Sequence, residues 1–263
     1  SRLRRTLPGY RDTPLYYAQL DSVLHGSRTL SDAAPFLPAD PGVRESTQEH
    51  FLVRAEEQAF RLRLADPRVR RSICLALEYR SFAQTLCRAL ESGNLKTVTV
   101  HGDPKLENFL FDSRTGGVKS LVDLDTVMPH TWLSDWGDMA RSLVNQAGET
   151  ETDLGRVGAD PEIFRAAAGG FLAAARHVPG GEAALMADAV GIMALELGVR
   201  FLADYLRGDT YFRLEPADPR DKNKTRALVQ FRLFEDVQSR LGELRRIVEG
   251  LLRENRGHEC AAS

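Results

Sequence analysis

The sequence predicts a mainly α protein (α+β overall), in which one small β element interrupts a series of helices. Apolar residues recur at helical spacing both before residue 91 and after residue 132, and this spacing is typical of amphipathic helices. Only short strand-like segments lie between these two regions. Hydrophobic residues make up 43% of the chain and charged residues 27%, which are ordinary globular values.

The N-terminal third divides into a Pro- and Gly-rich stretch and two helical regions. We expect residues 1–46 to form an irregular segment with one short helix at Pro14–His25. The main domain is expected over residues 47–263. Apolar spacing predicts helices over Thr47–Ala65 and Arg68–Glu91.

The β element is expected in the middle of the chain. Strand-like segments occur at Val98–Val100, Phe109–Phe111 and Val118–Leu124, and the turn-forming residues 112–117 join the last two into a predicted hairpin. After Trp132 the spacing is helical again, and it predicts helices over residues 133–146, 161–176, 181–206 and 220–253.

Charge and apolar patterning exclude some classes of partner. A formal net charge of −2 argues against a nucleic-acid-binding protein, which usually carries a basic domain or stripe. The most apolar helix, Val190–Leu206, is interrupted by Glu196, Arg200 and Asp204, so we expect no membrane span. A small-molecule partner remains, and nothing in the sequence indicates an oligomeric state.

The cysteines predict a reducing compartment. The three cysteines lack the number and spacing of a disulfide framework or a zinc site. Cys74 and Cys87 fall in an apolar helical pattern, where we expect small buried side chains. This usage favours the cytoplasm.

The run from His101 to Asn108 contains the residue types that phosphoryl transfer requires. It lies between two predicted strands, and catalytic groups concentrate on loops held by a rigid scaffold. Asp103 could orient an attacking hydroxyl and accept its proton, and Lys105 could stabilise the charge of the transferred phosphoryl group. Asn108 offers an oxygen ligand for magnesium. His101 is expected to anchor the loop rather than to act as a base.

The predicted hairpin brings a second oxygen ligand to Asn108. If the turn is centred between Thr115 and Gly116, the pairs that face each other are Asp112 with Lys119, Phe109 with Val122, and Asn108 with Asp123. Directly opposed residues have Cβ atoms about 4.5–5.5 Å apart. Two oxygen ligands at that separation could share one magnesium ion, whose bonds to oxygen are roughly 2 Å long.

His-Gly-Asp-Pro-Lys-Leu-Glu-Asn at residues 101–108 is similar to the catalytic loop of protein kinases. It resembles more closely that of the aminoglycoside phosphotransferase and choline kinase-like family. The resemblance implies the helical C-terminal lobe of a protein-kinase-like fold, with ATP as co-substrate and Mg²⁺ as cofactor. It also implies that Asp123 is a second magnesium ligand and that Asp138 is a structural residue bracing the catalytic loop. Asp125 could be a further metal-site residue, or could touch substrate.

A narrower resemblance suggests the acceptor. The motifs at residues 7–14, 122–129 and 198–212 resemble the N-acetylhexosamine 1-kinase-like branch of the family. This implies a sugar or amino-sugar acceptor that contacts Asp103, Arg200 and Tyr211. Alternatively, Arg200 is a solvated helix charge and Tyr211 packs on the core. Gly102 and His130 depart from the residues expected in that branch, and both departures concern the substrate rather than the reaction.

Part of the nucleotide-binding machinery has no counterpart in the sequence. Kinases of this kind have a β-rich N-terminal lobe with a loop over the phosphates and a strand lysine. The chain contains no G-x-G-x-x-G motif and no lysine in an early strand. We therefore expect either a C-lobe fragment of a longer protein or a relative that has lost nucleotide binding, with little activity alone.

Two other classes remain open from sequence. Asp-Leu-Asp-Thr-Val at residues 123–127 also resembles the D-x-D-x-T motif of haloacid dehalogenase-like phosphatases, with Val127 at its last position, and Asp123 would then be the nucleophile. That motif should open a doubly wound domain, whereas helices are predicted to follow it here. The remaining class is a non-catalytic binding domain with a kinase-like shape.

Overall fold

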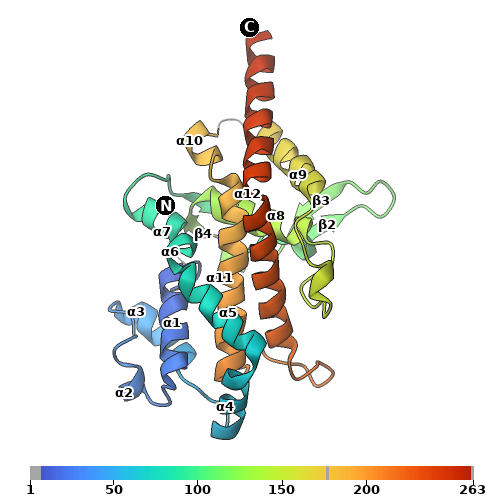
Figure 1. Ribbon diagram of the computed structural model, residues 1–263. Helices are drawn as coiled ribbons and strands as arrows, with labels where there is room; N and C mark the ends of the chain where they lie inside the picture. Colours follow the sequence, from blue (N-terminus) through green and yellow to red (C-terminus); the bar gives the residue numbers. More distant parts are fainter. Residues whose placement is uncertain (1–6, 176–177, 262–263) are drawn as a thin grey trace.

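The computed structural model describes residues 7–175 and 178–261, with side chains up to residue 254, and it confirms the mainly helical fold. In its described part, all strands belong to two antiparallel sheets of two strands each. Figure 1 shows long helices side by side at the centre, with shorter helices and a projecting hairpin around them.

The N-terminal region is more helical than its Pro- and Gly-rich composition predicts. The predicted short helix is confirmed as α1 (Thr13–His25), and its Tyr17, Leu20 and Val23 are buried in the main core. The single helix predicted over Thr47–Ala65 is interrupted, because the chain between residues 51 and 57 is not helical and the backbone amides of Arg54 and Ala55 donate to the carbonyl oxygen of Arg207. The short helices here are α2 (Leu30–Ala33), α3 (Pro41–Thr47), the 3₁₀ helix η1 (Gln48–Phe51) and α4 (Glu57–Ala65).

The predicted helix over Arg68–Glu91 is broken into three. These are α5 (Pro67–Glu78), α6 (Arg80–Ala83) and α7 (Thr85–Glu91). Cys74 on α5 is exposed and Cys87 on α7 is partly buried, so the predicted burial of both thiols is wrong for Cys74. α5 buries Val69, Ser72 and Ala76 instead, a face that does not include Cys74.

The β element forms two small sheets. Strand β1 (Val98–Val100) pairs with β4 (Met128–His130), which was not predicted; it contains Pro129, and proline is uncommon inside strands. Strands β2 (Phe109–Phe111) and β3 (Val118–Leu121) form the predicted hairpin. The 3₁₀ helix η2 (Leu106–Asn108) lies between β1 and β2, and η3 (Leu124–Thr126) lies between β3 and β4. The β1–β4 pairing places the start of the catalytic loop beside the segment that follows the hairpin.

The C-terminal helices form the core. Helix α11 (Met186–Arg207) is buried along almost its whole length between α1, α8 (Trp132–Val144) and α12 (Lys222–Ala261). Trp136 of α8 is fully buried, and its indole N–H donates to the carbonyl oxygen of Met186 at 2.8 Å. The end of α12 projects beyond the other elements (Figure 1). The remaining elements are the 3₁₀ helix η4 (Leu154–Arg156), α9 (Pro161–Ala174) and α10 (Gly180–Ala183).

Among the helices of residues 7–175 and 178–261, none is both long and apolar enough to cross a membrane.

Candidate active site

Backbone contacts hold the catalytic loop at its beginning. Asp135, in the first turn of α8, accepts hydrogen bonds from the amides of His101 (2.6 Å) and Gly102 (2.9 Å). Burial raises the pKa of Asp135 despite these donors. The hydroxyl of Thr126 donates to the carbonyl oxygen of His101 at 2.7 Å. The loop is thus held by α8 on one side and by η3 on the other.

Gly102 occupies a position where a side chain does not fit. Its φ is +89°, and a Cβ atom there would lie 2.4 Å from the carbonyl oxygen of Thr126. Its own carbonyl oxygen accepts from Nε (2.9 Å) and Nη2 (2.6 Å) of Arg11. Glycine at position 102 therefore allows a close backbone approach that this loop requires.

Arg11 links the N-terminal segment to the catalytic loop and to two helices. Its guanidinium is buried and pairs with Asp138 on α8 (2.5 Å) and Glu196 on α11 (3.0 Å). Glu196 also accepts from the hydroxyl of Thr13 at 2.6 Å. Asp138, which the sequence resemblance makes a brace of the loop, therefore reaches Gly102 through Arg11, while Asp135 makes the direct contact.

The network around Arg11 continues as a chain of alternating charges. Asp138 also binds Arg141, which pairs with Glu149, which in turn pairs with Arg226. Burial opposes ionisation of Asp138, but the two guanidinium groups outweigh it and lower its pKa to about 2. Charges in such a network are each compensated. The members in order are Glu196, Arg11, Asp138, Arg141, Glu149 and Arg226.

The predicted catalytic side chains lie together in the loop. The ammonium of Lys105 is 2.8 Å from Oδ2 of Asp103, and the amide nitrogen of Asn108 donates to the carbonyl oxygen (2.7 Å) and to Oδ2 (3.2 Å) of the same residue. Burial opposes the charge on Lys105, but Asp103 outweighs it and raises its pKa, so the amine stays protonated. The carboxylate of Asp103 is thus oriented by two donors.

His101 is engaged through both ring nitrogens. Its Nε2 donates to the carbonyl oxygen of Val122 at 3.0 Å, and its Nδ1 accepts from the amide of Asp103 at 3.3 Å. The ring therefore spans from the loop to the residue before Asp123. This geometry is that of an anchor and leaves no ring nitrogen for proton abstraction.

The hairpin register differs from the predicted one, by one residue at Phe109 and Leu110 and by two at Phe111. Phe109 pairs with Leu121 and Leu110 with Ser120, but Phe111 pairs with Val118. Lys119 is the extra residue of a β-bulge. The turn is tighter than predicted, because the side chain of Asp112 accepts from the amides of Arg114 and Thr115 and its backbone pairs with Gly117.

Asn108 consequently lies opposite Val122, not Asp123. The amide of Val122 donates to the carbonyl oxygen of Asn108 at 3.0 Å. The predicted backbone opposition of Asp112 and Lys119 is wrong as well, although their side chains form an ion pair at 2.8 Å. Asp123 follows Val122 directly, and it has a left-handed backbone with φ 68° and ψ 63°.

Asn108 and Asp123 could supply two of the oxygen ligands of a magnesium ion, but not a complete set. Asp123 is exposed, and no described side chain or backbone group forms a hydrogen bond or ion pair with its carboxylate. The side-chain nitrogen of Asn108 donates to Asp103, so the side-chain oxygen of Asn108 remains available to a cation. In the described part of the chain, no three His, Cys, Asp or Glu side chains gather into a metal site. Magnesium is commonly held by one or two protein groups together with substrate phosphates and water, and Asn108 with Asp123 fits that pattern.

Asp125, the third predicted metal-site residue, lies in η3 two residues further on. It is exposed at the surface and it has partners within the protein. It is therefore less available to a cation than Asp123.

The residues predicted to bind substrate and the pair predicted to be catalytic line one pocket. A pocket of about 420 Å³ is lined by Asp103, Lys105, Arg200 and Tyr211 together with other residues. Arg200 comes from α11, and Tyr211 from the loop that follows this helix. The buried carboxylate of Asp204 orders that loop by accepting from the amides of residues 210–212. Pockets of this volume are typical of small-molecule sites.

Three residues of this site were missed by sequence reasoning. Arg11 lies within the motif at residues 7–14, where it was noted for resemblance only, and its left-handed φ of 56° marks a constrained position. Asp135 stands three residues before Asp138 on the same helix. Thr126 follows Asp125 in the motif after the hairpin. All three lie within or next to the sequence motifs that contain the predicted aspartates, and this position in the sequence was the only indication of their role.

One comparison with known families bears on these residues. Residues 28–167 match the family APH, the phosphotransferase enzyme family. The match spans more than half of the chain and includes the catalytic loop, the hairpin and α8.

Proposed function

We propose that this chain, which belongs to the APH phosphotransferase enzyme family, transfers the γ-phosphoryl group of ATP to a hydroxyl of a sugar. The acceptor favoured by the sequence resemblance is an N-acetylhexosamine-like sugar. The observation that carries this proposal is the shared pocket, in which Asp103 and Lys105 face the same space as Arg200 and Tyr211. An acceptor in that space would contact both pairs at once.

Asp103 is the residue proposed to act on the acceptor hydroxyl. Its carboxylate is held in a fixed orientation by Lys105 and Asn108. It would orient the hydroxyl and accept its proton as the bond to phosphorus forms. Phosphoryl transfer depends mainly on such positioning and on charge stabilisation, and the protonated amine of Lys105 supplies a cation beside the reacting group.

The remaining cationic stabilisation would come from the cofactor. Asn108 and Asp123 would hold magnesium, which supplies charge neutralisation to the phosphates when bound. The sequence contains no G-x-G-x-x-G phosphate loop, and its first lysine is Lys96, so no lysine lies in an early strand. We therefore expect slow transfer by this chain alone, well below the roughly 1–100 s⁻¹ of kinases.

The described fold does not support the phosphatase alternative. A nucleophilic Asp123 in a haloacid dehalogenase-like domain requires a doubly wound parallel sheet. The described residues contain two antiparallel sheets of two strands each, and helices α8 to α12 follow Asp123. The non-catalytic alternative is left to experiment.

The experiment is phosphoryl transfer from ATP to N-acetylglucosamine in the presence of Mg²⁺, followed by ³¹P NMR. We expect a slow signal of sugar phosphate from the wild-type chain. Asp103→Asn should reduce it by roughly 10²–10⁴-fold, the usual contribution of a general base, while sugar binding measured by calorimetry persists.

The matched control is Asp40→Asn, the same chemical change at an exposed helix N-cap, where Asn serves as well as Asp. This variant should keep the wild-type rate. Equal rates for Asp103→Asn and wild type would remove Asp103 from the mechanism. Binding of the sugar without any transfer would favour the non-catalytic class.

A further inference from the structure

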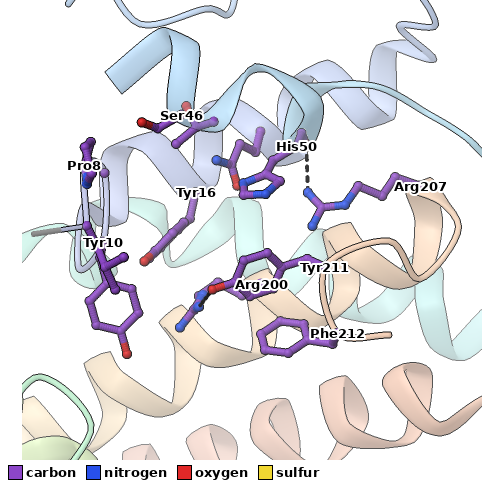
Figure 2. Close-up of a pocket in the computed structure, with 13 residues that line it drawn as sticks. Pro8, Tyr10, Tyr16, Ser46, His50, Arg200, Arg207, Tyr211 and Phe212 are labelled. Carbon is purple, nitrogen blue, oxygen red and sulfur yellow. Dashed lines mark hydrogen bonds between the residues drawn. The ribbon is translucent and has the colours of Figure 1, made fainter. Parts of the chain in front are cut away.

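A second pocket adjoins the catalytic one. It has a volume of about 390 Å³, and Tyr10, Arg200 and Tyr211 line both pockets. Figure 2 shows this second pocket, with Ser46 on the side opposite to Arg200. The guanidinium of Arg200 is therefore part of the wall between the two spaces.

Arg200 is a cation without a carboxylate partner in the described part of the chain. Its one hydrogen bond there is a long contact of 3.5 Å to the hydroxyl of Tyr211. Aromatic rings surround it instead, with the ring centroids of Tyr10, Tyr16 and Phe212 at 5.3, 4.9 and 5.4 Å. Burial lowers its pKa, but the neighbouring phenols outweigh burial and raise it, so the guanidinium is charged.

The nearby charged network does not neutralise Arg200. Glu196 and Asp204 each lie four residues from Arg200 on α11. Both carboxylate oxygens of Glu196 are taken by Arg11 and Thr13, and those of Asp204 accept from Arg207 and from the amides of residues 210–212. The network that begins at Glu196 matches its carboxylates with three other arginines. Arg200 remains as an additional positive charge.

The second pocket is positive and contains no acidic side chain among the described residues that line it. Arg207 also lines it, although its guanidinium pairs with Asp204 at 2.8 Å. His50 also lines this pocket, and burial, followed by Arg207, lowers its pKa to about 4. At neutral pH its ring is uncharged.

Tyr16 adds a hydrogen-bond donor. Its hydroxyl oxygen accepts from the amide of Arg11 at 2.9 Å, and its own proton has no acceptor within the described part of the chain. Burial raises the pKa of this phenol, so it stays protonated. A charged guanidinium with a phenol donor beside it is suited to an oxyanion.

We infer that the second pocket binds the anionic group, a carboxylate or a phosphate, of a small sugar molecule, with Arg200 as its counter-ion. The inference rests on the proposed function in one respect: the hydroxyl of the same molecule would lie in the catalytic pocket beside Asp103. Binding of the anion is favourable because it gives the unpaired guanidinium of Arg200 a charge-assisted hydrogen-bond partner.

The test is calorimetric titration of the 263-residue chain without ATP, using glucuronate, glucose 6-phosphate and glucose as probes. We expect each charged sugar to bind at least tenfold more tightly than glucose. Arg200→Gln should remove this preference, and Arg253→Gln, the same change at an exposed position of α12, should keep it.

A second pair of variants tests the charge without touching Arg200. Ser46 is exposed and lines the pocket, so Ser46→Glu and Ser46→Gln should both fold. The added carboxylate in Ser46→Glu should weaken binding of the charged sugars at least fivefold, and Ser46→Gln should not. Equal binding of charged and neutral sugars, unchanged binding in Arg200→Gln or Ser46→Glu, or no binding of either anion would overturn the inference. Because the titration contains no ATP, these results are independent of whether transfer occurs.

Discussion

The guanidinium of Arg11 donates two hydrogen bonds to the carbonyl oxygen of Gly102, 91 residues away in sequence. The same group pairs with Asp138 and Glu196. One buried arginine thus connects the segment before α1 to the catalytic loop, to α8 and to α11. Positioning of Asp103 depends on this connection, because Gly102 directly precedes it.

Arg11→Met should strongly destabilise the fold. Removing one partner of a buried ion pair leaves uncompensated charge and costs about 3–5 kcal/mol, and here two carboxylates lose a partner. The free energy of unfolding from urea denaturation measures this. Arg54→Met removes an exposed pair with Glu49 and should cost no more than about 1 kcal/mol. Equal losses in the two variants would contradict the role assigned to Arg11.

Gly102→Ala should destabilise the protein and displace the catalytic loop. The added Cβ would meet the carbonyl oxygen of Thr126 at 2.4 Å, in addition to the strain of φ +89°. We expect a loss of about 2–4 kcal/mol from strain and overpacking together. Gly93→Ala is the control, with φ +75° and open space, and should cost only about 1–2 kcal/mol. Thermal and urea unfolding would show whether the two variants differ.

The hairpin shows where prediction from sequence stops. Its existence follows from two short apolar strands around a Gly-rich turn, and the structure confirms it. Its register does not follow, because the side chain of Asp112 tightens the turn and Lys119 bulges out. Each effect shifts the pairing of residues, and neither leaves a periodic signal. Asn108 therefore faces Val122 rather than Asp123.

The support of the loop was also beyond sequence patterns. Asp103, Lys105 and Asn108 are close in sequence, so their chemistry could be inferred from residue types. Arg11 and Asp135 contact the loop only because α1 packs on α11, α11 on α8 and α8 on β1. Long-range hydrogen bonds of this kind have no spacing rule in the chain.

Acid should weaken the fold through Asp138. Its pKa is lowered from the ordinary 3.8 to about 2 because Arg11 and Arg141 outweigh the effect of burial. A lowered carboxyl pKa in the folded state gives stability that is fully present above pH 4 and is lost as the pH falls through 2. This contribution is on the order of 2 kcal/mol.

Asp138→Asn tests that assignment. The variant should be less stable at pH 6, and its free energy of unfolding should fall less steeply than that of wild type between pH 4 and 2. Glu254→Gln, at an exposed position near the end of α12, should leave the wild-type slope intact. Identical slopes for Asp138→Asn and wild type would show that other carboxylates govern acid unfolding.

Asp123 has a strained backbone conformation and is also a proposed magnesium ligand. It is an exposed aspartate with a left-handed backbone, a conformation that costs a non-glycine residue about 1–2 kcal/mol. Asp123→Gly should relieve the strain and raise the free energy of unfolding by about 1 kcal/mol, yet it should weaken Mg²⁺ binding measured by calorimetry in the presence of ATP. Asp123→Asn, which tolerates the same backbone, should leave stability within about 0.5 kcal/mol and also weaken binding of the ion. If both variants bind Mg²⁺ as wild type does, the strained carboxylate is not a ligand, and the left-handed turn at Asp123 serves only to direct the chain from β3 into η3.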